Sequence, residues 1–336
     1  MSLEVAVAAA ILACLIVYAL LGGADFGGGL WDLLASGPRA RAQRETIAHA
    51  IGPIWEANHV WMIVAVVLLF TAFPPAFSTI MTALHVPVTL MLVGIVLRGS
   101  SFVFRKMTPE GEGEASAWQL VFAGSSIVTP VMLGVVLGAI STRAIGYEDG
   151  LVTGGFVRPW LAPFPWVVGV FALALFAFLA AVYLIHESRD EALREDFRLR
   201  ALWAGGAVLI LGALTFGMAR RAAPDVAAHL VSRRSGIMAA VLGAGTLAAA
   251  LFALRARRYG TARVLAVCVV VAVLTGWGLG MAPWLVAGAL TIQESAAPPV
   301  TLRLVSGVLL GGTVLLVPAF AYLYLTFKRD VLFPRG

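Results

Sequence analysis

Long apolar runs separated by short polar connections are the feature that most constrains the fold of this chain. Nine such runs can be marked off, each close to the roughly 20 residues that cross a bilayer as a helix. The connections between them reach about 20 residues at most, which leaves no room for a soluble domain. The sequence therefore predicts an all-α integral membrane protein. The runs lie at about 3–24, 51–72, 77–104, 118–141, 160–186, 201–219, 235–254, 262–282 and 304–327, and the first can continue as a helix toward Leu34.

Composition supports a membrane protein. The chain is 60% hydrophobic and 12% charged, whereas soluble domains carry about 25% charged residues. The first run has no basic segment before it and no small-residue cleavage site after it, so we expect a retained span rather than a signal peptide. Cys14 and Cys268 both lie in apolar runs, which predicts neither a disulfide framework nor a thiolate metal site.

The order of the spans suggests how they are grouped. A division into four, four and one would give two four-helix bundles and a peripheral helix, although no residue-level repeat is visible. We expect an N-terminal half at 1–145 that carries the functional motifs and a C-terminal half at 160–328 with five helices. The acidic stretch 108–116 is predicted to be a flexible inner loop, and 294–299 an outer turn.

The basic residues orient the spans. If the N-terminus lies outside, 17 of the 24 lysines and arginines fall in cytoplasmic segments. We therefore expect the N-terminus outside and the C-terminus in the cytoplasm. The exception is 220–234, where four arginines fall on the predicted outer side. Because the basic residues are scattered over short loops, the net charge of +6 does not indicate nucleic-acid binding.

The start of the second run carries titratable residues close to hydrocarbon. At 100° per residue, His49, Gly52, Glu56 and His59 fall within about 80° on one helix face, away from Asn58 and Trp61. An ionised carboxylate there costs several kcal/mol unless it has a partner or a watery cavity. Such a file suits proton uptake from the cytoplasm. The alternative is a packing cluster in which Glu56 bonds to a neighbouring helix.

A glycine-rich segment at 22–32 places Asp25 near the inner end of the first span. Glycines let helices approach closely, so Asp25 can lie beside the inner end of the second span and belong to the same proton path. The alternative is a tight helix crossing in which the aspartate acts as a cap. The segment is not a phosphate loop, because it lacks the Gly-Lys-Ser/Thr ending.

Two metal chemistries can be weighed against these residues. Glu56 and His59 match the Glu-x-x-His pattern of di-iron bundles, but such a site needs two copies and two further carboxylates, and this chain has one copy. The five histidines form no obvious facing pair for haem. We expect neither a metal site nor haem ligation in this chain.

Three motifs together carry a family resemblance. Residues 22–32 resemble the glycine–aspartate motif that ends the first helix of subunit II of cytochrome bd-type (cyanide-insensitive-like) quinol oxidases. Residues 51–61 are similar to that family's Pro-x-Trp-Asp-Gly-Asn-x-Val-Trp, and 97–105 resemble its Arg-Gly-x-x-Phe-Glu-Phe-Arg. The residues of these motifs that we expect to support packing are Trp55, Asn58, Trp61, Arg98 and Arg105.

The motifs also depart from the family pattern. Glu56 replaces the more usual aspartate, Ala57 replaces glycine, and His59 stands where an acidic or amide residue is common. Val103 replaces the glutamate of the third motif, which argues against a polar role at that position.

The resemblance implies a function. Such a complex oxidises quinol at the outer side of the prokaryotic plasma membrane and reduces dioxygen to water, drawing protons from the cytoplasm and generating proton motive force. The haem b and haem d-type groups, their ligands and the quinol-oxidising loop belong to subunit I. This chain would then be the companion in a heterodimer, with no catalytic residue and no bound haem of its own. The family can also hold a structural quinone in this subunit and add a small single-span subunit.

Two other functions compete with this one. A stand-alone proton-coupled secondary transporter would use a glycine-broken helix and a membrane carboxylate, but no inverted repeat is detectable. A structural scaffold would leave Glu56 without a role. Neither alternative explains the three motifs together.

Overall fold

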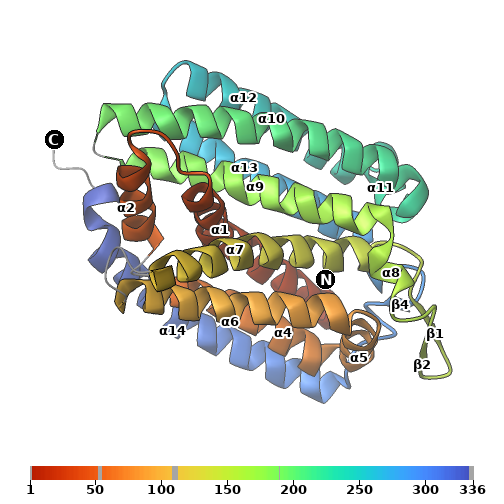
Figure 1. Ribbon diagram of the computed structural model, residues 1–336. Coiled ribbons are helices and arrows are strands. Elements are labelled where there is room, and N and C mark those ends of the chain that lie inside the picture. The colour runs from red at the N-terminus through yellow and green to blue at the C-terminus, as the bar shows by residue number, and fades with distance from the viewer. Residues whose placement is uncertain (1, 52–54, 108–112, 189, 333–336) are drawn as a thin grey trace.

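The computed structural model describes residues 2–51, 55–107, 113–188 and 190–332, and these residues are almost entirely helical (Figure 1). The spanning helices are α1 (Leu3–Leu33), α4 (Val60–Ala72) with the short α3 (Trp55–Asn58) before it, α6 (His85–Met107), α7 (Gly113–Ile140), α9 (Pro163–Glu187), α10 (Glu191–Ala222), α12 (Arg234–Arg255), α13 (Tyr259–Met281) and α14 (Pro299–Leu332). Within the described ranges, nine helical segments are long and apolar enough to cross a membrane. The prediction of an all-α membrane protein with nine spans is confirmed.

Short elements lie at the two ends of the bundle. One end holds α2 (Ala40–Ile51), and the other holds α5 (Pro74–Ala83), α8 (Arg158–Leu161) and α11 (Pro224–Ser232) (Figure 1). The second end also carries two antiparallel hairpins, β1 (Gly146–Glu148) with β2 (Leu151–Thr153) and β3 (Trp284–Val286) with β4 (Leu290–Thr291). The sequence analysis expected no strands and no separate short helices in these places, and it assigned most of α5 to a spanning run. We call the two ends the α2 end and the hairpin end.

Hydrogen bonds between segments that are distant in sequence show which segments lie at the same end of the helix bundle. At the α2 end, Arg39 donates two hydrogen bonds of 2.9 and 2.6 Å to Asp196, which raises the pKa of Arg39. At the hairpin end, the guanidinium of Arg143 donates hydrogen bonds of 3.0 and 2.8 Å to the carboxylate of Asp225. There too, the backbone N–H of Ala287 donates to the backbone carbonyl of Ile140. The segments around Arg39 and Asp196, both assigned to the inner side by the basic-residue count, therefore share the α2 end.

Several helix boundaries differ from the prediction. The run expected at 77–104 is divided at Leu84 into α5 and α6, and Pro87 in the first turn of α6 is tolerated because the N–H it lacks has no partner there. The run expected at 201–219 begins ten residues earlier, where Asp190 accepts a hydrogen bond from the backbone N–H of Ala192 as a helix cap. Residues 113–116, expected in the acidic loop, begin α7, while 108–112 lie outside the described residues.

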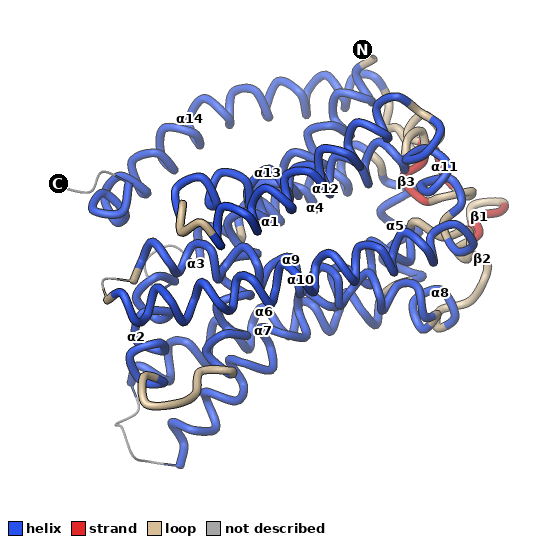
Figure 2. Tube along the Cα trace, turned by 90° about the horizontal axis from the view of Figure 1, so that it is seen from above, coloured by secondary structure: helices blue, strands red, loops and turns tan. Residues whose placement is uncertain are grey.

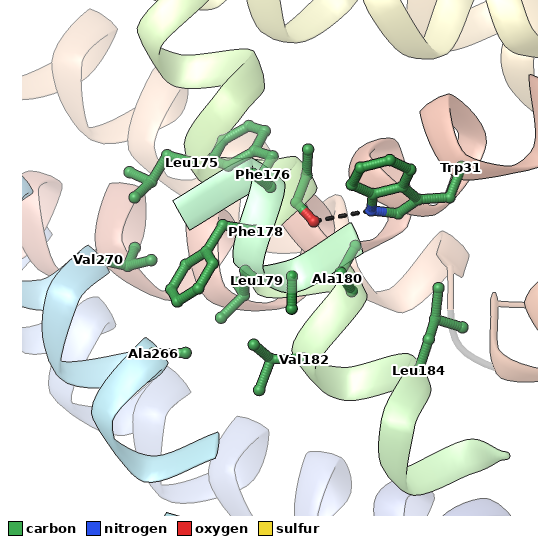
Figure 3. Packing of buried hydrophobic residues seen from close by; sticks show 14 of the residues in the cluster. Trp31, Leu175, Phe176, Phe178, Leu179, Ala180, Val182, Leu184, Ala266 and Val270 are labelled. Atoms are coloured by element: carbon green, nitrogen blue, oxygen red, sulfur yellow. Dashed lines mark hydrogen bonds between the residues drawn. The ribbon is translucent and has the colours of Figure 1, made fainter. Parts of the chain in front are cut away.

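The two bundles meet along α9. The first bundle contains α1, α4, α6 and α7, and the second contains α9, α10, α12 and α13. Apolar side chains of α9 pack toward α13, where Ala266 and Val270 meet them, while Trp31 of α1 donates a 2.8 Å hydrogen bond to the carbonyl of Ala177 (Figure 3). The main buried cluster thus draws on both bundles.

α14 lies along one edge of the molecule (Figure 2). It contacts α4 and α1, and none of the residues in its most apolar window is buried. The expected arrangement of two four-helix bundles with a peripheral helix therefore describes the structure.

Candidate functional site

The glycine-rich segment of α1 packs closely against two other helices, α7 and α9. A Cβ on Gly27 would collide with the backbone carbonyl of Phe176 in α9, and one on Gly29 with the hydroxyl of Ser126 in α7. Only glycine allows this approach. The close packing fixes the last third of α1, and with it Asp25, against its neighbours.

Asp25 sits in a buried polar cluster with Asn58. Its side chain is 5% exposed, and its carboxylate accepts a 2.7 Å hydrogen bond from the amide nitrogen of Asn58, which is fully buried. Asn58 ends the one-turn helix α3, so the inner part of the second span meets the end of the first. A buried carboxylate needs such donors to remain charged.

Arg98 brings a buried positive charge to the same cluster. Its side chain is 1% exposed, and its Nη2 donates a 3.1 Å hydrogen bond to the backbone carbonyl of Asp25. The guanidinium lies over the rings of Phe26 and Phe122, with its carbon 4.9 and 5.3 Å from their centres. The Nε of Arg98 has no hydrogen-bond partner within the described ranges. The charge is therefore balanced by Asp25 and by aromatic faces rather than by solvent.

His59 lies half-buried in an aromatic cage beside this cluster. The rings of Tyr18 and Phe26 meet the imidazole edge-on at 5.8 Å each, and that of Trp55 meets it at 6.1 Å. Its Nδ1 lies 2.9 Å from the carbonyl of Trp55. Because a carbonyl can only accept, Nδ1 carries the hydrogen, and Nε2 is left buried with no partner among the residues the structure describes.

The remaining residues of the predicted proton file lie apart from this cluster. Glu56 and His49 are exposed, and His49 belongs to α2 rather than to the second span. Gly52 lies outside the described residues. On α3, Glu56 and Asn58 are about 200° apart, so Asn58 turns inward to Asp25 and Glu56 turns outward. The structure thus brings together Asp25, Asn58, Arg98 and His59, and does not bring Glu56 to them.

The residues expected to support packing have separate environments. The indole of Trp55 lies against Gly99 and the ring of Phe102, and Trp61 packs on Phe320 of α14 with ring centres 5.4 Å apart. Arg105 lies in α6, and its side chain is outside the described part of the chain. Val103 is 42% exposed, in keeping with an apolar position on the outer face of α6.

Sequence reasoning missed two features of this cluster. Tyr18 gave no signal, because a tyrosine inside an apolar run is unremarkable by pattern, yet it is 1% exposed and packs on both Phe26 and His59. Arg98 was expected only to support packing. Its position inside the third apolar run, seven residues before Arg105, is the signal that it would need a buried counter-charge.

Among the described residues, no three histidine, cysteine or acidic side chains gather where they could hold a metal ion. The ring nitrogens of His85 and His186 face the backbone carbonyls of Thr82 and Val182, and His229 faces the hydroxyl of Ser235.

Comparison with known proteins identifies the family. The model of the family "Cytochrome bd terminal oxidase subunit II" matches residues 3–327. A Bacillus subtilis (strain 168) protein named "Putative cytochrome bd menaquinol oxidase subunit II" is 22% identical over 323 residues, 94% of this chain and 92% of the relative. The Escherichia coli (strain K12) cytochrome bd-I ubiquinol oxidase subunit 2 is 27% identical over 174 residues, 51% of this chain and 45% of the relative.

A solved structure supports the same fold. A chain in the structure of bd oxidase from Geobacillus thermodenitrificans has a TM-score of 0.76 and 20% identity, and the match covers 97% of this chain and 99% of that one. Because the family model spans nearly the whole sequence, the chain belongs to the cytochrome bd terminal oxidase subunit II family.

Proposed function

We propose that this chain pairs with a haem-bearing subunit I in a prokaryotic plasma membrane and contributes to a proton path for the reduction of dioxygen to water by quinol. The haem b and haem d-type groups and the quinol-oxidation site would belong to subunit I. A structurally bound quinone in this chain and a small single-span third subunit remain part of the proposal. The α2 end would face the cytoplasm.

The observation that carries the proton-path proposal is that Asn58 and Glu56 point in opposite directions on α3. Asn58 and Arg98 hold Asp25 in a fixed, charge-balanced cluster, which suits a structural carboxylate at the end of α1. Glu56 is exposed on the opposite side of the same turn. A carboxylate there would be costly against hydrocarbon, but it is well placed on a surface that another protein covers. We therefore infer that Glu56 faces subunit I and that the proton path runs along the interface.

His59 would connect the two sites. Its Nε2 is buried and has no protein partner in the described part of the chain, so a water molecule could bond to it. His49, exposed on α2, would lie at the cytoplasmic end of the path, and Asp25 would belong to the path from its buried cluster near the inner end of α1. A chain of titratable groups and waters is how protons cross apolar protein.

The experiment is a comparison of two Glu56 variants in the assembled complex. Glu56→Gln keeps the shape and the hydrogen-bonding atoms but cannot carry a proton, so oxygen reduction should fall by roughly 10²-fold or more. Glu56→Asp should retain much of the turnover, because the carboxylate remains. Glu148→Gln, an exposed glutamate of β1 at the hairpin end, is the matched control and should be silent. Normal turnover of Glu56→Gln in an assembled, haem-replete complex would make Glu56 a packing residue.

A second experiment tests the assignment of haem to subunit I. This chain purified alone should bind no haem, because none of the described histidines faces another as an axial pair. Stoichiometric haem in the single subunit, lost on His59→Ala or His85→Ala, would place the ligands in this chain.

A further inference from the structure

Four arginines gather at the hairpin end. Arg220 and Arg221 lie in the last turn of α10, Arg233 follows α11, and Arg234 begins α12. All four are exposed, and none donates a side-chain hydrogen bond or forms an ion pair within the described ranges. The nearby acidic residue, Asp225, is already bound by Arg143. The hairpin end thus carries four exposed positive charges within 15 residues of sequence, where the basic-residue rule predicts few.

The positive charge of one of these arginines affects the protonation of a neighbouring histidine, His229. His229 lies in α11, between the two arginine pairs. Burial lowers the pKa of its imidazole, and the charge of Arg233 lowers it further. A local positive field of this kind favours an anion.

A cavity of about 470 Å³ begins beside the arginines. This volume is within the range of roughly 300–1,000 Å³ that holds a small organic ligand. Its walls come from α1, α7, α9, α10, α11, α12 and α13, and they are almost wholly apolar. Ala219, next to Arg220, and Leu230 of α11 both line it. The arginines therefore stand at one end of an apolar chamber.

The cavity faces the surface between α10 and α12. These two helices are the outermost of their bundle (Figure 1), and the lining residues Leu209, Phe216 and Ala240 are exposed. Small residues keep the space open, because a Cβ on Gly243 would meet only the Cβ of Ala272, at 3.7 Å. A long molecule could enter here from the hydrocarbon region without unfolding the protein.

One wall residue of the cavity, Thr215, carries a buried hydroxyl. This hydroxyl has no hydrogen-bond partner among the described residues. It lies five residues before Arg220, so it is roughly 8 Å deeper along α10. By contrast, the hydroxyl of Ser141 already accepts a hydrogen bond from the indole of Trp277 at 2.9 Å. The site thus offers positive charge at one end, a hydroxyl about one and a half turns of α10 from that end, and an apolar chamber beside them.

We propose that this site binds an anionic phospholipid, with its phosphate held by Arg220, Arg221, Arg233 and Arg234, and one acyl chain in the cavity. The Thr215 hydroxyl would donate to an ester carbonyl of the lipid. Guanidinium groups suit phosphate oxygens, and the order of charge, hydroxyl and hydrocarbon matches the order of groups along such a lipid. The proposal also gives the four arginines a reason to lie at the hairpin end.

The test uses the purified complex with subunit I, stripped of loose lipid and equilibrated with an equal mixture of phosphatidylglycerol and phosphatidylcholine. Lipid retained after washing is measured by mass spectrometry. We expect about one retained phosphatidylglycerol per complex. Neutralising arginines to glutamine in pairs should weaken retention by roughly fivefold per residue. Replacing all four by lysine keeps the charge and should retain most of the binding.

Matched controls separate this site from general attraction of lipid. Arg158→Gln with Arg303→Gln removes two exposed arginines on α8 and α14, helices that do not line the cavity, and should change nothing. Gly243→Leu fills the cavity and should abolish retention. Gly245→Leu, where a Cβ meets nothing within 4 Å and which does not line the cavity, should leave it intact.

Three outcomes would overturn the proposal. One is equal retention of the two phospholipids by the unaltered complex. Another is phosphatidylglycerol retention that survives neutralisation of all four arginines. The third is a neutral isoprenoid molecule in the cavity in place of the phospholipid, displaced by Gly243→Leu but indifferent to the arginines.

Discussion

The amide of Asn58 donates a 2.7 Å hydrogen bond to the carboxylate of Asp25, and this contact joins the glycine-rich end of the first span to the start of the second. The two residues are 33 positions apart in sequence and both are buried. Arg98 reaches the same point from α6 through the backbone carbonyl of Asp25. Three motifs that are separate in sequence thus converge on one residue, Asp25.

Asn58 should be needed for stability rather than for turnover as such. Asn58→Leu removes a buried donor from the Asp25 carboxylate, which should cost about 1–3 kcal/mol. The thermal unfolding midpoint of the purified complex should fall accordingly, while the haem-normalised activity of the surviving complex changes little. A large loss of turnover at unchanged stability would instead make Asn58 part of the proton path.

The charge balance between Arg98 and Asp25 predicts a non-additive mutant cycle. Arg98→Leu leaves a buried carboxylate without its counter-charge, and removing one member of a buried pair costs about 3–5 kcal/mol. Asp25→Asn alone should harm stability for the opposite reason. The double variant should be more stable than the sum of the single changes predicts, measured as the unfolding midpoint of the complex. Strict additivity would show that Asp25 does not balance Arg98.

The sequence predicted the spans well because each one is recorded locally in about 20 apolar residues. Asp25 and the start of the second span could also be placed together, since both were assigned to the same end. The orientation of Glu56 could not be predicted. The continuous-helix argument placed it on one face with His49 through Gly52, which lies outside the described residues, whereas the structure places His49 in α2 and leaves Glu56 exposed on α3. The neighbours that a helix face meets in a membrane depend on other helices, which pattern alone does not show.

The cavity and the counter-charge of Arg98 could not be predicted from the sequence for the same reason. Both depend on which helices are neighbours: Phe26 comes from α1 and Phe122 from α7, and the cavity walls come from seven helices. One sequence without a repeat or an interhelical pattern contains no direct record of such contacts. The four arginines at 220–234 were visible as an exception to the charge rule, but their relation to a cavity was not.

Gly27 should tolerate no side chain. A Cβ there would collide with the backbone carbonyl of Phe176, which cannot move aside without shifting α9. Gly27→Ala should therefore destabilise the complex by about 1–3 kcal/mol, seen as a lower unfolding midpoint and a lower yield of assembled heterodimer. The control is Gly245→Ala, where a Cβ has open space, and it should be neutral or slightly stabilising because alanine favours the helix. Equal stability of the two variants would contradict the close approach of α1 and α9.

Orientation in the membrane is the last prediction, and the structure gives it two independent probes. The C-terminal end of α14 and the turn of the β1–β2 hairpin lie at opposite ends of the bundle (Figure 1). Because lysine and arginine accumulate in cytoplasmic segments, and two segments assigned to that side share the α2 end, a reporter fused after Gly336 should be active in the cytoplasm. The second probe is the variant Asp149→Cys, at an exposed position of the hairpin turn, whose new thiol should react with a membrane-impermeant maleimide in intact cells. The native thiols should not interfere, because Cys14 is buried and Cys268 lies within a span.

If the reporter works only outside and the introduced thiol is protected, the orientation is reversed. In that case His49 and the inner end of α1 would face the wrong side for cytoplasmic proton uptake, and the four arginines at the hairpin end would no longer be exceptions to the charge rule.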